Sequence, residues 1–401
     1  MPKRVFITGI GIISSIGNGV QQTLESLLAC RSGIGEITLF NSIHKGKLPL
    51  AEVKLPTCDL LGMTGHAGQK QFTRTALLGM IAAGEALRSA SIDDPAEFRT
   101  GLISATTVGG MDRSEEFYEQ FLENPAKGRL IDIVNHDCGD STDRIARHAG
   151  ITEFVTTIST ACSSSANTIM LGAELIRSGR LDCALAGGTD SVTRFTLNGF
   201  NTLMILDKTG CRPFDDNRAG LTLGEGAAFL VLESEEMVSR FHKPVLAELT
   251  GYGNANDAYH QTASSPDGTG AFLAMSKALS MAGIAPGSIS YVNVHGTGTQ
   301  NNDLSEGIAL ERIFVDEMPP FSSTKPFTGH TLGAAGAVEA VLSVLAIQNG
   351  IIYPNLRFET PMKELKIRPE TRLRTGIRIS HVLSNSFGFG GNNSTLILSK
   401  A

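Results

Sequence analysis

The sequence predicts a globular α/β protein, because β-branched apolar segments alternate with helical segments that are rich in small residues. Of its 401 residues, 41% are apolar and only 18% are charged, which is typical of a chain that buries a large core. A chain of this length buries roughly three quarters of the surface of its unfolded state. The mild net charge of −6 is spread along the chain, which argues against non-specific binding of nucleic acids.

Several segments have the composition of β-strands. In the first half of the chain they are residues 5–8, 102–104, 154–158 and 182–186, and in the second half residues 245–249, 291–294 and 395–398. Helical segments separate them, and the polar stretches 32–71 and 112–143 have the composition of loops. We expect these loops to be insertions that cover a site rather than build the core.

A weak internal repeat divides the chain. Residues 5–11 (VFITGIG) resemble residues 247–253 (AELTGYG). We therefore expect two duplicated halves, residues 1–244 and residues 245–401, which pack as one body. Because the first half is longer, the loop-like stretches are its extra material.

The cysteines and histidines argue against disulfide bonds and a zinc site. The six cysteines form no CxxC pair, and the nine histidines show no HExxH spacing. The apolar run at residues 5–13 imitates a signal peptide, but Gly9 and Gly11 interrupt it and no A-x-A pattern follows. The apolar segment 332–347 contains Glu339. We therefore expect a cytoplasmic protein with no membrane-spanning segment.

Cys162 occupies a position in which an α/β fold can place a nucleophile. The strand-like residues 154–159 lead into it, and apolar residues from Ala166 to Ile176 then recur on one face of a helix that Gly179 ends. Unpaired N–H groups and the helix dipole at such a turn stabilise a thiolate, so we expect a lowered thiol pKa. The alternative is a buried structural cysteine.

Two histidines in the second half lie in similar glycine-rich turns. His295 follows the strand-like residues 291–294 in the sequence HGTGT, and His330 follows Thr-Gly just before a small-residue helix. Strand ends and helix starts are where α/β active sites collect. A lone histidine at either place would be interpreted as structural, but two of them and a cysteine in such turns predict nucleophilic catalysis.

Together, these motifs resemble the β-ketoacyl-acyl-carrier-protein synthases, in the elongating I/II branch of the thiolase superfamily. The matching motifs are TACSSS (160–165), RPFD and GEGA (212–227), HGTGT (295–299), STKPFTGHTLGAAGAVEA (323–340) and NSFGFGG (385–391). The resemblance implies a five-layer αβαβα fold, a homodimer, an acyl-carrier protein as partner and no cofactor. The implied reaction is a decarboxylating Claisen condensation of an acyl-enzyme thioester with malonyl-acyl-carrier protein. It gives 3-oxoacyl-acyl-carrier protein and CO2, as in fatty-acid elongation.

The resemblance also implies roles for single residues. Cys162 matches the nucleophile that accepts the acyl chain, and His295 and His330 match the pair that promotes loss of the malonyl carboxylate. Lys325 and Glu339 match a lysine and a glutamate of the family, and a Lys325 cation would favour neutral imidazoles.

Further matches concern the substrate, the oxyanion and ions. Phe389 matches a gating phenylalanine whose N–H group, with that of Cys162, stabilises the tetrahedral oxyanion. Thr297 and Thr299 match contacts to the pantetheine arm, and Asp303 matches an acidic residue that orders the site. Val108 belongs to a segment that matches the end of the acyl pocket. The positions that bind a monovalent cation in some relatives are matched by Asn293, Glu339, Ser384 and Asn385.

An acyl-carrier protein is acidic, so the resemblance implies a local basic patch despite the negative net charge. The candidates for this docking patch are Lys70, Arg74, Lys127, Arg129 and Lys208. The alternative for each is an ordinary solvated side chain.

The chain also departs from the common housekeeping synthases. Residues 202–214 differ, and Asn392-Asn393 stands where Thr-Asn is usual. A specialised polyene, pigment or polyketide ketosynthase with the same chemistry therefore stays open as an alternative. A non-catalytic chain-length-factor subunit is more remote, because it would lack the nucleophile at Cys162. The GxGxxG pattern of dinucleotide-binding folds fails at Ser14.

Overall fold

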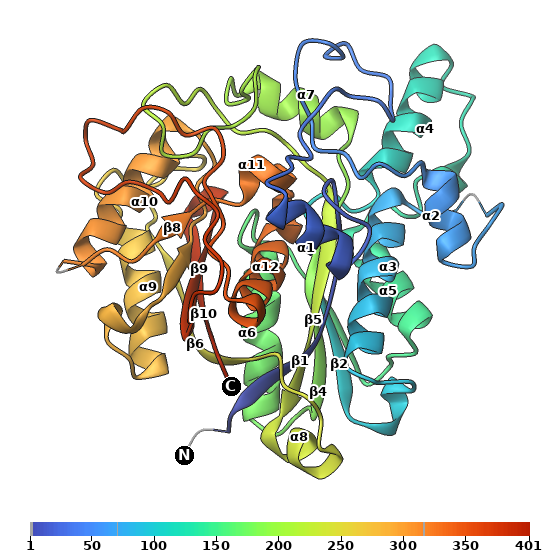
Figure 1. Cartoon of the computed structure of the whole chain (residues 1–401). Coiled ribbons are helices and arrows are strands. Elements are labelled where there is room, and N and C mark those ends of the chain that lie inside the picture. The colour runs from blue at the N-terminus through green and yellow to red at the C-terminus, as the bar shows by residue number, and fades with distance from the viewer. Residues whose placement is uncertain (1–2, 70, 316) are drawn as a thin grey trace.

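Ten strands form one mixed sheet in the computed structural model, which describes residues 3–69, 71–315 and 317–401 (Figure 1). The strands are β1 (Val5–Ser14), β2 (Thr100–Ala105), β3 (Phe154–Ile158), β4 (Cys183–Asp190), β5 (Gly226–Ser234), β6 (Ala247–Asn256), β7 (Tyr291–Asn293), β8 (Phe321–Ser322), β9 (His381–Gly388) and β10 (Asn392–Ser399). The segment 154–158 coincides with β3, whereas β5, β8 and β9 were not predicted.

The helices fill the connections between these strands. They are α1 (Val20–Leu28), α2 (Thr57–Met63), α3 (Arg74–Ser89), α4 (Met111–Glu123), α5 (Cys138–Ala149), α6 (Ser164–Arg177), α7 (Arg194–Thr202), α8 (Glu235–Phe241), α9 (Thr269–Ala282), α10 (Gln300–Ile313), α11 (Lys325–Thr328) and α12 (Ala335–Asn349). Both stretches that were expected to be loops contain helices. Helix α2 lies in the stretch 32–71, and most of α4, the short 3-10 turn η2 (Leu130–Asp132) and the start of α5 lie in the stretch 112–143.

The strand order repeats about the centre of the sheet. It runs β3-β2-β4-β5-β1-β6-β10-β9-β7-β8, so the last five strands repeat the arrangement of the first five outward from the β1–β6 junction. In each half the strands farthest from this junction are parallel and those beside it are antiparallel. The similar segments of sequence lie on the two central strands. The division of the chain at residues 244 and 245 stays a prediction.

Paired glycines explain why these two segments look alike. A Cβ atom on Gly9 or Gly11 would lie 2.3 or 2.1 Å from backbone carbonyls of α3, and on Gly251 or Gly253 it would lie 2.3 Å from those of α9. Only glycine therefore lets each central strand approach its covering helix so closely.

The elements stack in five layers, which confirms the predicted fold class. Helices α6 and α12 lie in the middle between the two parts of the sheet, α3 and α5 cover one outer face, and α9 and α10 cover the other (Figure 1). The segment Leu332–Asn349 is long and apolar enough to cross a membrane by length and composition, but 89% of it is buried inside the protein. It is the central helix of the core.

Candidate active site

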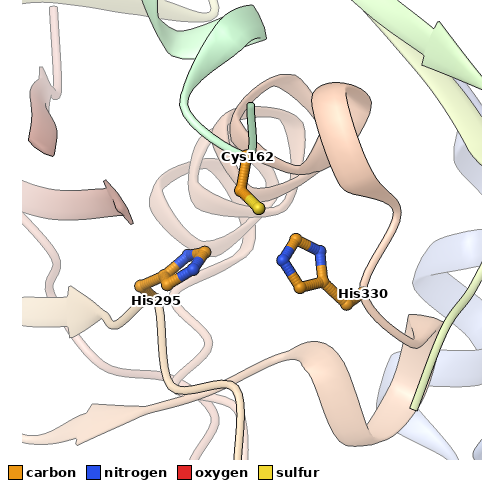
Figure 2. A group of neighbouring side chains, drawn as sticks. All are labelled: Cys162, His295 and His330. Atoms are coloured by element: carbon orange, nitrogen blue, oxygen red, sulfur yellow. The ribbon is translucent and has the colours of Figure 1, made fainter. Parts of the chain in front are cut away.

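Cys162 lies in a tight turn between β3 and α6. Ala161, just before it, has the left-handed backbone angle φ 53°, and the N-cap of α6 is Ser163. The hydroxyl of Ser164 accepts from Thr160 N at 2.8 Å and donates to Ala161 O at 2.5 Å. These bonds hold the strained turn, so that the thiol points away from the helix toward the two histidines (Figure 2).

The structure brings both predicted histidines to this thiol. One ring nitrogen of His295, one of His330 and Cys162 Sγ all lie within 4.8 Å of one another, and both rings face the thiol (Figure 2). The ring centroids are 5.4 Å apart, with the planes at 86°. Among the described residues, no other group of three His, Cys, Asp or Glu side chains is close enough to share a metal ion.

The hydrogen bonds of the two rings fix which nitrogen carries the proton. The N–H of Leu332 donates to His330 Nδ1 at 3.1 Å, and Lys325 Nζ lies 3.3 Å from His295 Nδ1. A neutral imidazole whose Nδ1 accepts a hydrogen bond carries its proton on Nε2. Burial, and then the charge of Lys325, lower the pKa of both histidines well below the ordinary value. At neutral pH the site therefore presents two uncharged N–H donors.

All three ammonium protons of Lys325 are used in hydrogen bonds, two with His295 and one with Glu339. The residue is 1% exposed, and the three acceptors are His295 Nδ1, His295 O at 2.5 Å, and the carboxylate of Glu339. Burial raises the pKa of Glu339 above its ordinary value, although the ammonium group of Lys325 opposes this shift. The ammonium charge beside His295 also disfavours a metal cation between the two rings.

The predicted lowering of the Cys162 pKa is wrong for this site without substrate. Burial raises the pKa of the thiol to about 11, and it outweighs the lowering effects of Lys325 and of a hydrogen bond from the Phe389 N–H group. The turn sits inside the protein rather than at an exposed helix end, so the desolvation of a thiolate dominates.

We expect the alkylation of Cys162 by iodoacetamide to show this raised pKa. The thiolate is the reactive form, so the rate should rise roughly tenfold per pH unit from pH 7 to pH 10, whereas an ordinary thiol with a pKa near 8.5 levels off about pH 9. The measurement is the rate of mass increase at Cys162 with pH. A plateau below pH 9 would contradict the account of burial.

Two cavities meet at Cys162 and Phe389. The first, of about 350 Å³, contains both histidines, Thr297 and Thr299 and reaches polar residues such as Asn301. The second, of about 430 Å³, is mainly apolar and is lined by Val108, Met111, Phe195, Phe200 and Leu332. The rings of Phe200 and Phe389 stack with centroids 6.0 Å apart. Phe389 therefore stands between an entrance cavity of mixed polarity and an apolar pocket.

Comparison with known proteins shows the family. Residues 2–237 match the model for the β-ketoacyl synthase N-terminal domain, and residues 246–359 match the model for its C-terminal domain. The chain belongs to the β-ketoacyl synthase family. It is 33% identical to 3-oxoacyl-[acyl-carrier-protein] synthase 2 of Staphylococcus aureus (strain N315), covering 99% of this chain and 98% of that one.

Two other similarities extend over the whole chain. The putative mitochondrial 3-oxoacyl-[acyl-carrier-protein] synthase of Schizosaccharomyces pombe is 33% identical, with 99% of both chains covered. The structure described as the ishigamide ketosynthase/chain length factor superposes with a TM-score of 0.93 at 33% identity and covers all of both chains.

Two buried carboxylates hold the turn that carries His295 in this family member. Asp303 accepts from the N–H groups of Thr297 at 3.0 Å and Gly298 at 3.2 Å, as an ordering role requires. Glu306 accepts from the N–H of His295 at 2.9 Å, and burial raises its pKa to about 7. Glu306 was not among the residues predicted from the sequence, although its spacing of three from Asp303 places both on one face of α10.

The predicted cation ligands fit an ion only in part. Glu339 Oε2 and Ser384 Oγ are buried and have no hydrogen-bond partner among the described residues, as free ligands would. Asn385 differs, because its Nδ2 donates to Glu306 at 3.0 Å and its Oδ1 accepts from a threonine on β10. Asn293 donates to the backbone of Glu339. The cation site stays a prediction.

The predicted docking patch needs one correction. Arg74 is 9% exposed and forms a bidentate pair with Glu225 at 2.6 and 2.9 Å, so it ties α3 to the strand region and cannot form a docking surface. Lys70 lies outside the described residues. Lys127, Arg129 and Lys208 are exposed, and their role in docking stays a prediction.

Proposed function

We propose that the protein is a 3-oxoacyl-[acyl-carrier-protein] synthase that condenses an acyl chain on Cys162 with a malonyl thioester. The observation that carries this proposal is the close approach of a thiol and two neutral N–H donors, at the junction of an entrance cavity of mixed polarity and an apolar pocket. The names of the two relatives that are 33% identical support the carrier-protein substrate.

Acyl transfer to Cys162 is the first step. As a substrate enters, the thiol loses its proton and the sulfur attacks the thioester carbonyl of the acyl-carrier protein. The carbonyl oxygen becomes an oxyanion, which the N–H groups of Cys162 and Phe389 stabilise. The C–S bond to the carrier breaks, and the carrier thiolate takes up the proton. The acyl chain then occupies the apolar pocket beside Val108.

Loss of CO2 from the malonyl thioester is the second step. His295 and His330 donate their Nε2–H groups to its thioester carbonyl, so the electrons of the breaking C–CO2⁻ bond form a stabilised enolate. The enolate carbon attacks the acyl carbonyl on Cys162, a C–C bond forms, and the C–S bond to Cys162 breaks. The released Cys162 thiolate takes up a proton from water and is again a thiol. The product is 3-oxoacyl-acyl-carrier protein. Thr297 and Thr299 line the entrance where the pantetheine arm would lie.

Incubation of the purified protein with acyl- and malonyl-acyl-carrier protein tests the function. We expect CO2 and a 3-oxoacyl product in equal amounts, detected by mass spectrometry. Enzyme that stays unacylated and releases no CO2 with several acyl chain lengths would overturn the proposal.

We also propose that the protein acts as a homodimer, joined along β3 and α4. Strand β3 ends the sheet on one side, and its other edge has no partner strand among the described residues. Every residue of α4 is at least partly exposed, although the helix carries Tyr118, Phe121 and Leu122. The 3-10 turn η2 adds exposed Leu130 and Ile131. An unpaired strand edge and an exposed apolar helix surface each favour a second subunit.

The double substitution Tyr118→Asp and Leu122→Asp is expected to raise the dimer dissociation constant by about 100-fold or more, because burying unpaired carboxylates costs several kcal/mol. Sedimentation velocity measures the change. Val315→Asp is the control, since Val315 is also an exposed apolar residue but follows α10. A wild-type monomer at micromolar concentration, or a double variant that dimerises like the wild type, would contradict the proposal.

A ketosynthase that pairs with a chain length factor is the second candidate. It is favoured by the close superposition on the ishigamide ketosynthase/chain length factor, and it would use the same chemistry on a specialised acyl chain. The presence of Cys162 argues against a non-catalytic subunit. The cytoplasmic location also stays a prediction, because one of the relatives is named as mitochondrial.

A further inference from the structure

Asn392 links the turn that carries Cys162 to the segment that carries Phe389. Its Oδ1 lies 2.6 Å from the hydroxyl of Ser163 and accepts from Asn167 Nδ2 on α6 at 3.0 Å. Asn392 begins β10, immediately after the turn η5 (Phe389–Gly391), and Ser163 immediately follows Cys162. The carboxamide of Asn392 therefore connects the chain just after Phe389 to the chain just after Cys162. The N–H groups of Phe389 and Cys162 are the two that would stabilise the oxyanion.

The segment around Phe389 needs such an external contact. Gly390 and Gly391 both have positive φ angles, of 80° and 76°, so the segment has little stiffness of its own. Gly390 is held by Asn256 and by the carbonyl of Gln261. Those contacts lead to β6 and to the loop after it. Asn392 also accepts from Asn254 on β6, but its contacts with Ser163 and Asn167 lead to the Cys162 turn itself.

The hydroxyl of Ser163 is shared between two acceptors. It has one proton, with Thr160 O at 2.7 Å and Asn392 Oδ1 at 2.6 Å. Asn167 Nδ2 bridges the same two residues, because it donates to Thr160 Oγ1 at 2.8 Å as well as to Asn392. The carboxamide is therefore part of the hydrogen-bonding of the turn, and its loss would leave the turn joined to β10 by fewer bonds.

We propose that Asn392 is a positioning residue, which sets the distance between the N–H groups of Cys162 and Phe389. The proposal rests on the function proposed above, in which both N–H groups stabilise the oxyanion. A displacement of about 1 Å at a reacting centre can cost roughly 10²-fold in rate. Asn392→Ala should therefore slow acyl transfer to Cys162 by roughly 10- to 100-fold.

Two reactions of the same thiol distinguish positioning from a general structural role. Single-turnover acylation by acyl-carrier protein needs the oxyanion N–H groups, whereas alkylation by iodoacetamide needs only an accessible thiolate. In Asn392→Ala, acylation is expected to fall several-fold more than the alkylation rate, because the Phe389 N–H group is only one of the groups that stabilise the thiolate, whereas it is one of the two donors to the oxyanion. Asn392→Asp keeps an acceptor oxygen in place and should recover most of the acylation rate.

Ser163→Ala removes the other side of the same contact. The effects of Ser163→Ala and Asn392→Ala on acylation should be less than additive in the double variant, because each single change already removes the contact between the two residues. Ser399→Ala is the matched control, since Ser399 lies on the same strand and bonds Thr250 and His381 rather than Asn392 or the Cys162 turn.

The outcomes are separable. Acylation of Asn392→Ala at the wild-type rate, or an equal fall of acylation and alkylation, would overturn the role of Asn392 alone. A wild-type enzyme that is never acylated at Cys162 would overturn the proposed function and this inference with it.

Discussion

Replacing Cys162 by alanine is expected to abolish acylation and to lower condensation by roughly 10⁴-fold or more, as the loss of a nucleophile does in other enzymes. Both histidines keep their hydrogen bonds in this variant, because neither Leu332 N nor Lys325 depends on the thiol. Decarboxylation of malonyl-acyl-carrier protein should therefore continue without condensation. Intact mass of the enzyme and release of CO2 measure the two activities separately.

Cys58→Ala provides the control for this experiment, since Cys58 is exposed on α2. It should acylate and condense like the wild type. Full condensation by Cys162→Ala would remove Cys162 from the role of nucleophile.

Replacing His330 by alanine is expected to have the second largest effect. The ring supplies one of two N–H donors to the malonyl carbonyl, and the loss of one such donor typically costs about 10²–10³ in rate. Acylation of Cys162 should be retained, because its oxyanion uses backbone N–H groups. The split between retained acylation and lost CO2 release is the expected signature.

His381→Ala is the matched control for that variant. His381 is partly buried and bonds Ser399 on β10, and it is absent from the lining of both cavities. Its loss should leave CO2 release unchanged. Unchanged turnover in His330→Ala would refute the role of His330 as a donor to the malonyl carbonyl. An equal loss of acylation and decarboxylation would also contradict this role, because it would mean that the ring maintains the structure of the whole site.

The nucleophile could be located from sequence because its position depends on local patterns. The β-branched run 154–158 forms β3 with those bounds, and the helical period after Cys162 forms α6. The turns that carry His295 and His330 are equally local. These turns come together because the strand order of the first half is repeated in the second. In the sequence, only the similar glycine-containing segments of β1 and β6 indicate this repeat.

The features that could not be predicted depend on contacts between distant parts of the chain. Strand β5 is buried throughout, so its apolar run lacks the alternation that marks a half-buried strand. The raised pKa of Cys162 results from burial by both halves of the chain. Nothing near Arg74 in the sequence indicates that it is buried, because its partner Glu225 is far away along the chain. The hydrogen bond between Asn392 and Ser163 likewise joins residues 229 positions apart.

The most direct test of the account is peptide mapping of the enzyme after incubation with acyl-carrier proteins that carry acyl chains of different length and unsaturation. We expect one acyl group per chain, attached to Cys162 in the wild type and in His330→Ala and absent from Cys162→Ala. The preferred chain would also separate fatty-acid elongation from a specialised pathway. An acyl group on any other residue, or wild-type enzyme without one, would contradict the central claim that Cys162 carries the growing chain.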